Sequence, residues 1–517
     1  MTLPWLTTLT ILPLLGGIVV AGLDRERRHL ARGFGLGFML LAAGLALSLW
    51  WNFDGGSGTL QFPERYTWIP SLGAEYFVAV DGLGLLMVLL TAFVLPFALL
   101  ASWSVRENLK TFVALLLFLE AGLFGAFTAL NFVHWFIFWE LSLVPAYFLI
   151  KLWGGPQRTE AATQFFLYTM GGSVTLLLSF LAMYLATGTF DFFQLADLSR
   201  SGQLEGMLAD ALGWRDLSRG ALAMVIFAGV FLGFAVKVPV FPFHTWLPGA
   251  YTAAPTGVAM VLTGVMSKMG LYGFLRILLP IFPEQMRAVL TPLLWLAVAT
   301  IVASAFTAFA QRDLKRLIAY SSINHLGYCL LGLFAVLEVT GREPQWAAEK
   351  AAALNGVLLQ MFNHGVTASA LFCFVGLIEQ RSGGLRGLDD FGGLRKVAPV
   401  FCGLMGISVF ASLGLPGLSG FVGEFLIFKG AFPLAPWAAT LSLLGLLVTA
   451  IFLLTLLQRV FHGPLEAKCS GFGELTLAEG LLVLPAVALM FVLGLWPQAV
   501  IGFINSTVLQ MTKQLGS

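Results

Sequence analysis

Charged residues are scarce in this chain. Of its 517 residues only 11% are Asp, Glu, Lys or Arg, whereas 58% are hydrophobic. A soluble domain carries roughly 25% charged residues, because charge keeps its surface in water. The composition therefore excludes an ordinary globular protein and predicts a polytopic membrane protein.

An excess of basic charge is also missing. The 29 Lys and Arg residues are balanced by 27 Asp and Glu residues, which leaves a net charge of +2. Nucleic-acid binding requires a basic surface that attracts phosphate groups. We therefore exclude nucleic acid as a partner.

Cysteine is rare and scattered. Cys329, Cys373, Cys402 and Cys469 form no C-x-x-C pair and no Cys/His cluster. Zinc and iron–sulfur sites need closely spaced thiolates, so we interpret these cysteines as small apolar side chains. We expect no metal and no cofactor in this chain.

Long apolar runs are what the sequence has in abundance. A bilayer core about 30 Å thick requires roughly 20 apolar residues per helix, and about 14 runs meet this condition. They centre near residues 12, 42, 93, 120, 141, 175, 231, 267, 300, 327, 364, 413, 448 and 490. The predicted fold class is thus an all-α polytopic membrane protein with a single membrane domain over residues 1–517.

Basic residues indicate the orientation of these spans. Loops after odd-numbered spans hold most of the Lys and Arg residues, for example Arg25, Arg27, Arg312 and Lys315. Loops rich in Lys and Arg stay on the cytoplasmic side. We expect both termini on the opposite side.

Two of the runs contain helix breakers. The seventh has Pro239 and Pro242, and the twelfth has the Gly/Pro-rich run over residues 412–420. Broken helices at membrane depth persist only where protein or water satisfies the freed backbone groups. Their corresponding positions predict two inverted five-helix repeats, residues 111–280 and 291–460. Ordinary kinks are the alternative interpretation.

Ionisable side chains are stranded in the apolar runs at Glu120, Glu140, Lys237, Lys268 and Glu424. Each costs about 2.5 to 3.5 kcal/mol at a helix centre, so each should face a partner or water. Five such residues predict a polar line inside the bundle. Structural ion pairs are the competing explanation.

The helix breaks favour opposite charges. Lys237 precedes Pro239 at the end of a half-helix, where free carbonyl groups favour a cation. Glu424 lies near the start of a half-helix, where free N–H groups favour an anion. Glu140 is the acidic residue of the fifth span, and we expect it to pair with Lys237.

Histidines add groups that titrate near neutrality. His244 follows the first break, and His325 and His364 fall in the tenth and eleventh spans. Lysine, glutamate and histidine joined by water can conduct protons. Each histidine, taken alone, is equally well explained as a hydrogen-bonded core residue.

Several motifs together resemble the antiporter-like subunits of respiratory complex I, over about residues 80 to 465. They are Trp139-Glu140-Leu141-Ser142-Leu143-Val144-Pro145, the stretch from Lys237 to Pro248, Ser267-Lys268-Met269-Gly270, Asp313-Leu314-Lys315-Arg316 and Gly414-Leu415-Pro416-Gly417-Leu418-Ser419-Gly420-Phe421-Val422-Gly423-Glu424. Glu on the second broken helix is similar to the M type, the counterpart of mitochondrial subunit 4. The opening residues 4–7 and the region 463–465 also resemble the D subunit of the cyanobacterial NDH complex.

The resemblance implies a proton-translocating module within a quinone-reducing NAD(P)H or ferredoxin oxidoreductase, with no redox site in this chain. It implies Glu140 and Lys237 as a coupled pair, Lys268 as the central relay and Glu424 on the other half-channel. His325 and His364 would assist, and Glu120 matches a further acidic position. His244 completes the candidate relay.

One departure from the family is visible. Many relatives read Leu-Pro-Asp-Ala-His after the tryptophan, whereas this chain has Gly249 and Tyr251 at the positions of Asp and His. The change removes an acid and an imidazole near the first break. No role is assigned to these two positions.

The resemblance also implies partners and a location. We expect other membrane-arm subunits, the lipid bilayer and a quinone bound elsewhere in the complex, in a cyanobacterial thylakoid membrane or otherwise a bacterial inner membrane. An Mrp-type sodium/proton antiporter and a purely structural membrane scaffold are the alternative functions.

Overall fold

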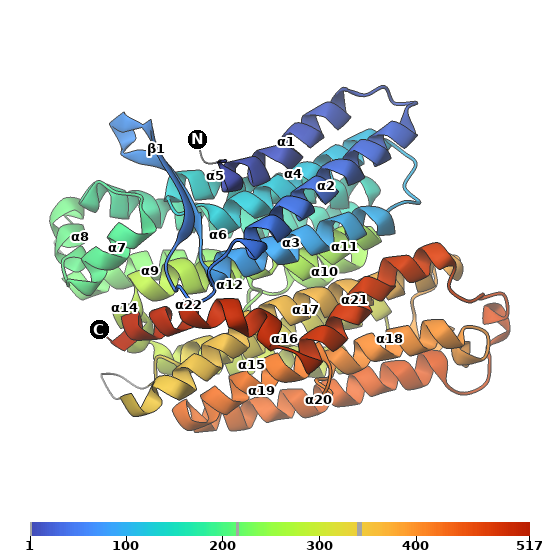
Figure 1. Cartoon of the computed structure of the whole chain (residues 1–517). Helices are drawn as coiled ribbons and strands as arrows, with labels where there is room; N and C mark the ends of the chain where they lie inside the picture. The colour runs from blue at the N-terminus through green and yellow to red at the C-terminus, as the bar shows by residue number, and fades with distance from the viewer. Residues whose placement is uncertain (1–2, 214–216, 339–343, 517) are drawn as a thin grey trace.

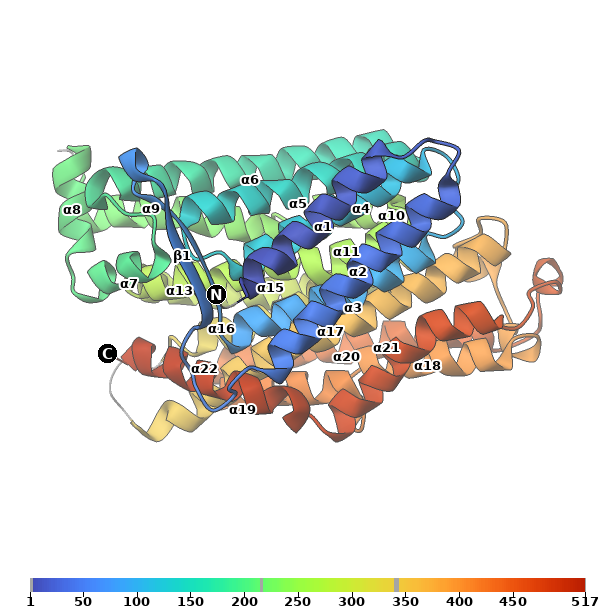
Figure 2. The same cartoon turned by 45° about the horizontal axis from the view of Figure 1, so that its top comes forward.

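The computed structural model describes residues 3–213, 217–338 and 344–516. Long helices lie side by side in one bundle (Figures 1 and 2). Thirteen helical stretches of the described residues are long and apolar enough to cross a membrane. They are α1 (Trp5–Gly22), α2 (Arg28–Trp51), α3 (Gly82–Ala101), α4 (Leu109–Thr128), α5 (Phe132–Trp153), α6 (Arg158–Thr187), α9 (Arg219–Lys237), the stretch Thr256–Ile281, α15 (Leu290–Phe309), α16 (Leu314–Ala335), α17 (Ala347–Arg381), α20 (Pro436–Phe461) and α21 (Leu477–Leu495).

Both predicted helix breaks are present. The seventh span stops at Lys237, and the chain turns before α10 (Trp246–Ala253). The twelfth span consists of two half-helices, α18 (Pro399–Ser412) and α19 (Ser419–Leu434). With this broken span, the prediction of about 14 spans is confirmed. The division into two inverted repeats stays a prediction.

Side chains satisfy backbone groups that the first break releases. The backbone N–H of Phe241 donates to Oγ1 of Thr300 at 3.0 Å, and the indole N–H of Trp246 donates to the carbonyl of Val236 at 3.0 Å. At the second break, Gly414 and Gly417 adopt φ values of +77° and +92°. Glycine suits these positions because other residues rarely adopt positive φ. Contacts within the chain thus satisfy part of the non-helical backbone. Both breaks also reach the surface of the chain, since Phe241 and Leu415 are exposed.

The eighth span is not a regular α-helix. It runs through α11 (Thr256–Val261), the π-helical turn η2 (Leu262–Met266), α12 (Lys268–Gly273), the π-helical turn η3 (Phe274–Leu278) and α13 (Leu279–Ile281). In η2 the N–H of Ser267 donates to the carbonyl of Leu262, five residues back, at 3.1 Å. Such widened turns occur frequently at functional sites. The sequence analysis did not predict them.

Short elements complete the described structure. They include an antiparallel hairpin, β1 (Gln61–Ile69) and β2 (Ala74–Val80), which the all-α prediction did not anticipate. Two short helices, α7 (Phe192–Arg200) and α8 (Leu204–Leu212), lie between α6 and α9. The remaining elements are α14 (Pro283–Ala288), α22 (Gln498–Gly516), and the 3-10 turns η1 (Pro70–Leu72), η4 (Pro344–Trp346), η5 (Leu388–Asp390), η6 (Leu394–Lys396) and η7 (Ala467–Cys469).

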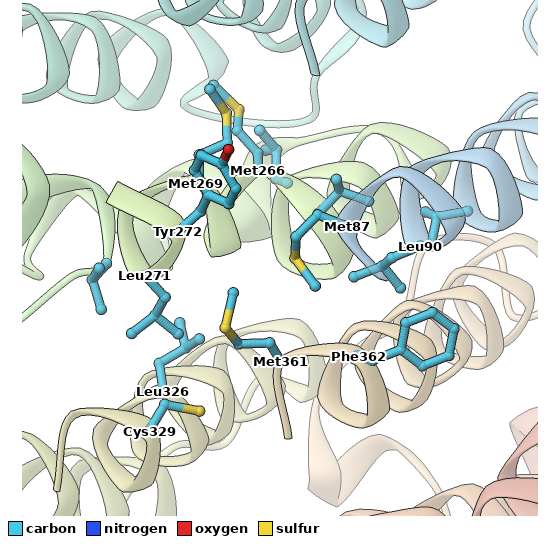
Figure 3. Close-up of a cluster of buried hydrophobic side chains, with 14 of the residues drawn as sticks. Met87, Leu90, Met266, Met269, Leu271, Tyr272, Leu326, Cys329, Met361 and Phe362 are labelled. Carbon is cyan, nitrogen blue, oxygen red and sulfur yellow. The ribbon is translucent and has the colours of Figure 1, made fainter. Parts of the chain in front are cut away.

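Three spans form the centre of the bundle. The most apolar windows of Thr256–Ile281, α16 and α17 are 100% buried, whereas those of α2 and α21 are 28% buried. Figure 3 shows apolar side chains from α3 and from these three spans, including Met87, Met266, Leu326 and Met361, around one buried region. The central spans are therefore shielded from lipid by the surrounding helices.

The hairpin supplies a cap for the first helix. Pro4, the N-cap of α1, offers no capping side chain. The carboxylate of Glu64, on β1, instead accepts from the backbone N–H groups of Leu6 at 2.8 Å and Thr7 at 3.2 Å. An anion at this end of a helix satisfies free donors and interacts favourably with the helix dipole.

We expect Glu64→Ala to lower the free energy of unfolding by about 0.5 to 2 kcal/mol, as for the loss of other N-terminal caps. Thermal unfolding of the complex in detergent measures this change. Glu26→Ala, which alters an exposed glutamate in the loop after α1, is the matched control. Equal unfolding midpoints for the two variants would contradict the capping role.

Candidate functional site

The candidate residues of the apolar spans are buried. Glu120, Lys237, Lys268, His325, His364 and Glu424 are each at most 5% exposed. Glu140 and His244 are half-buried. Lys268, His325 and His364 lie on the three central spans, and Glu424 lies on the half-helix α19. The fold thus concentrates ionisable groups where lipid does not reach.

Four of these residues form a continuous row. Nζ of Lys268 lies 2.7 Å from Nδ1 of His364. The rings of His364 and His325 lie side by side, with their centres 5.3 Å apart. Nδ1 of His325 lies 2.9 Å from Oε1 of Glu424. We call Lys268, His364, His325 and Glu424 the central row.

The π-helical turn η2 helps to place Lys268. The ammonium group of Lys268 donates to the carbonyl of Thr263, within this turn, at 2.5 Å. The hydroxyl of Ser267 donates to the same carbonyl at 3.0 Å. A regular α-helix would use that carbonyl for the backbone N–H of Ser267. The widened turn therefore leaves a carbonyl available to a buried cation.

Two residues that the sequence analysis missed fix the other end of the row. The amide of Gln360 donates to Oε1 of Glu424 at 3.0 Å. Nε2 of His325 lies 3.0 Å from the hydroxyl of Ser412, the last residue of α18. Ser412 lies directly before the Gly/Pro-rich break, and Gln360 lies four residues before His364 on α17. Helical spacing places i and i+4 on one face, which was the available signal for Gln360.

Backbone at the second break approaches Glu424 closely. A Cβ atom on Gly414 would lie 2.9 Å from Oε2 of Glu424, too close for a normal contact. Glycine at this position therefore leaves room for the carboxylate. The broken helix and the acidic end of the central row form one unit.

Lys237 stands apart from the row. Its Nζ atom lies 4.8 Å from the centre of the Trp139 ring, and it has no hydrogen-bond partner among the described residues. Oε1 of Glu140 likewise lacks a partner in this part of the chain. None of the ion pairs within the described ranges joins Glu140 to Lys237. The carboxylate of Glu140 is nevertheless close enough to act electrostatically on Lys237. The pairing of these two residues stays a prediction.

Glu120 and His244 are also separate. Both carboxylate oxygens of Glu120 are buried without a hydrogen-bond partner from the residues that the structure describes, as is Nδ1 of His244. The ring of His244 stacks on Phe241 in the turn that follows Lys237, with the ring centres 5.3 Å apart. Of the predicted polar line, only the part from Lys268 to Glu424 is thus connected by direct contacts.

A polar cavity opens beside the first break. It has a volume of about 500 Å³ and is lined by Thr245, Gly249, Glu160, Arg316 and Arg386, among others. Its size and polar lining suit several water molecules. A Cβ atom added to Gly249, which replaces the commoner acid, would make only ordinary contacts, so the missing side chain widens this cavity.

Two further ion pairs, one fully buried and one half-buried, escaped prediction. Arg276, in η3, pairs with Asp81, which also caps α3 through the N–H groups of Leu83 and Gly84. Lys315, at the start of α16, pairs with Glu379 at 2.6 Å. In the sequence these four residues look like ordinary helix-end charges. Each ion pair joins two residues that are far apart in the sequence, so sequence spacing could not predict it.

Within residues 3–213, 217–338 and 344–516, no group of three or more His, Cys, Asp or Glu side chains is arranged to hold a metal ion. The four cysteines are free thiols. Three of them are buried and Cys402 is half-buried. The ionisable groups that do meet in the interior are those of the central row.

Comparisons with known proteins give relatives over the whole length. Residues 129–452 match the family described as NADH:quinone oxidoreductase/Mrp antiporter, transmembrane. NADH-quinone oxidoreductase subunit M of Rhodobacter capsulatus is 35% identical over 513 residues, 98% of this chain and 96% of the relative. NAD(P)H-quinone oxidoreductase chain 4 3 of Trichormus variabilis is 36% identical over 468 residues, 89% of this chain and 82% of the relative.

Solved structures share the fold. A chain of respiratory complex I from Thermus thermophilus has a TM-score of 0.84 and 29% identity, over 99% of this chain and 100% of that chain. A chain of the Mrp complex from Dietzia has a TM-score of 0.83 at 21% identity, over the full length of both, which shows a common fold alone. With its family match and its full-length relatives, this multi-pass membrane protein belongs to the NADH:quinone oxidoreductase/Mrp antiporter transmembrane family.

Proposed function

We propose that this chain is a proton-translocating membrane subunit of a quinone-reducing NADH dehydrogenase assembly of the complex I type. The central row carries the proposal: an amine, two imidazoles and a carboxylate follow one another across the lipid-shielded core. Burying an ionisable residue in a membrane costs free energy, so four such residues adjacent in space indicate a proton path. The relatives named subunit M and chain 4 support the same assignment.

The chemistry of the row suits proton transfer. The amine of Lys268 and Nδ1 of His364 share one hydrogen bond, so a proton can pass between them. His325 and Glu424 share another. The two rings are adjacent without a hydrogen bond between them, so the step from His364 to His325 needs a water molecule or a ring rotation. Ser412 would couple that step to the broken helix through His325.

The two ends of the row point to access routes. The polar cavity beside the first break supplies water near His244 and the turn after Lys237. Glu424 lies beside the second break, where Gln360 and Ser412 hold the row's acidic end. We propose that protons enter through the first half-channel, by way of Glu140 and Lys237, and leave through the second. Glu120 would serve as a further proton site on α4.

We place the redox chemistry in partner subunits. The free cysteines are dispersed over α16, α17, α18 and η7, which is a poor arrangement for a metal cluster. Electron flow from NADH, NADPH or ferredoxin to quinone would then drive this chain through conformational and electrostatic coupling. A thylakoid or bacterial inner membrane is the proposed location, since relatives come from Trichormus as well as from Rhodobacter.

The expected result for Lys237→Met and Glu140→Gln, each introduced into the assembled complex, is a several-fold decrease in protons translocated per electron. Neither Nζ of Lys237 nor Oε1 of Glu140 has a hydrogen-bond partner within the described ranges whose loss would unfold the chain. Acidification of membrane vesicles, measured together with quinone reduction, reports the ratio. Glu284→Gln, which alters an exposed carboxylate, is the control.

A structural scaffold predicts the opposite pattern, with weaker assembly and normal pumping in whatever complex remains. An Mrp-type antiporter predicts proton movement that depends on sodium and continues without quinone reduction. Either of these results would overturn the proposed function.

A further inference from the structure

A small internal cavity is lined both by Lys237 and by Ser267, the residue directly before Lys268. Trp246 and Tyr251 are among the other buried residues that line it. No part of it is wide enough for a water molecule. Lys237, whose Nζ atom forms no hydrogen bond to any described residue, thus borders a dry space that it shares with Tyr251 and Ser267.

Two hydroxyl groups stand on the Lys268 side of this cavity. The hydroxyl of Tyr251 donates to the carbonyl of Leu262 at 2.9 Å, and that of Ser267 donates to the carbonyl of Thr263 at 3.0 Å. Both carbonyls belong to the π-helical turn η2. Lys268 donates to the Thr263 carbonyl as well. The hydroxyls are therefore held by the same turn that places the first residue of the central row.

The packing of its ring fixes Tyr251, whereas the side chain of Met266 can change its conformation. The tyrosine ring packs against Phe372 and Trp246, with ring centres 5.8 and 6.4 Å apart. Met266, which also lines the cavity, is unbranched and has a flexible side chain. A rotamer change of Met266 would widen the cavity without moving the hydroxyls away from η2.

We propose that the hydroxyls of Tyr251 and Ser267 relay protons between Lys237 and Lys268, across a cavity that conducts only when it widens to admit water. This inference rests on the proposed proton-translocating function. The ammonium of Lys237 gives a proton to the entering water. Lys268, neutral after passing its own proton to Nδ1 of His364, receives one. Each hydroxyl accepts a proton as it releases its own, so both end unchanged. When the cavity is dry, the relay is interrupted and protons do not leak back.

Tyr251→Phe tests the relay, because it keeps the packed ring and removes only the hydroxyl. We expect proton translocation per electron to fall about tenfold, less than the 100-fold or more that a sole positioned proton-transfer group contributes, because the hydroxyl of Ser267 remains. We also expect a larger solvent deuterium isotope effect on translocation, which a structural defect alone would not produce. Tyr251→His should restore translocation, since an imidazole also accepts and donates protons.

Matched controls separate the hydroxyl from the fold. Tyr184→Phe removes a phenol whose ring stacks on Phe190, far in sequence from the row, and should leave translocation unchanged. Ser267→Ala should also reduce translocation, whereas Ser442→Ala, which removes a similar hydroxyl bond to the preceding turn of α20, should not. If the Tyr251→Phe variant fails to assemble, the comparison of Ser267→Ala with Ser442→Ala tests the relay.

The outcomes distinguish this relay from the proposed function. Normal translocation in Tyr251→Phe and Ser267→Ala, with loss of translocation in Lys237→Met and Lys268→Met, overturns the relay and leaves the function standing. Normal translocation in both lysine variants overturns the function itself. Loss in all four variants, with both controls normal, supports both.

Discussion

Lys268→Met is expected to stop proton translocation almost completely while the chain stays folded. Lys268 is fully buried and connects the carbonyl of Thr263 to His364. A methionine fills similar space but can neither hold nor pass a proton. Because a positioned proton-transfer group contributes about 100-fold or more to a rate, we expect a decrease of about that size. Vesicle acidification per electron in the assembled complex measures it.

The control for this variant is Lys110→Met. Lys110 is also a lysine that donates to backbone carbonyls, those of Ala21 and Leu23, but it lies at the start of α4 and outside the row. It should translocate protons normally. Assembled Lys268→Met complexes that translocate at the rate of the Lys110→Met control would show that the central row is not the path.

Arg276→Met is expected to have the largest effect on stability. Arg276 and Asp81 form an ion pair in which both side chains are at most 7% exposed. Removing one partner of such a pair leaves a buried charge without compensation and costs about 3 to 5 kcal/mol. Asp81 also caps α3, so the damage reaches a second span. Unfolding of the complex in detergent, followed by a thiol-reactive or fluorescence probe, measures the loss.

The double variant Asp81→Asn with Arg276→Met provides the internal check. Asparagine can still cap α3 and carries no charge, so it should recover much of the stability lost in Arg276→Met. Arg200→Met, which removes an exposed i,i+3 pair with Asp197, should cost at most about 1 kcal/mol. An Arg276→Met effect no larger than that of Arg200→Met would refute the structural role of the buried pair.

Strong chemical constraints made the spans and their breaks predictable. Membrane helices need long apolar runs, and Pro239, Pro242 and the Gly/Pro-rich run over residues 412–420 disfavour a regular helix. The π-helical turns left no such mark, because η2 and η3 contain no proline and differ from an α-helix only in hydrogen-bond register. The hairpin was also invisible, since β2 adjoins the apolar run of α3 and its partner strand contains Pro63.

The candidate site was predictable in its members and not in its contacts. An ionisable residue within an apolar run is conspicuous, so Lys268, His325, His364 and Glu424 could be selected from the sequence. Which of them touch depends on how each helix is rotated, and sequence spacing does not determine rotation between separate helices. For Glu140 and Lys237 the structure gives an electrostatic interaction without a direct ion pair, which the sequence could not distinguish. The supporting Gln360 and Ser412 are polar but uncharged, which made them inconspicuous.

The fully enclosed position of the eighth, tenth and eleventh spans has a consequence for where this protein can work. Mismatch between helix length and bilayer thickness acts on helices that touch lipid. Here those are chiefly peripheral helices such as α2 and α21, whose apolar windows are mostly uncovered by protein. A thinner or thicker host membrane should thus tilt the periphery and leave the inner three helices in register. Expression in a membrane of different thickness should therefore leave the geometry of the central row unchanged.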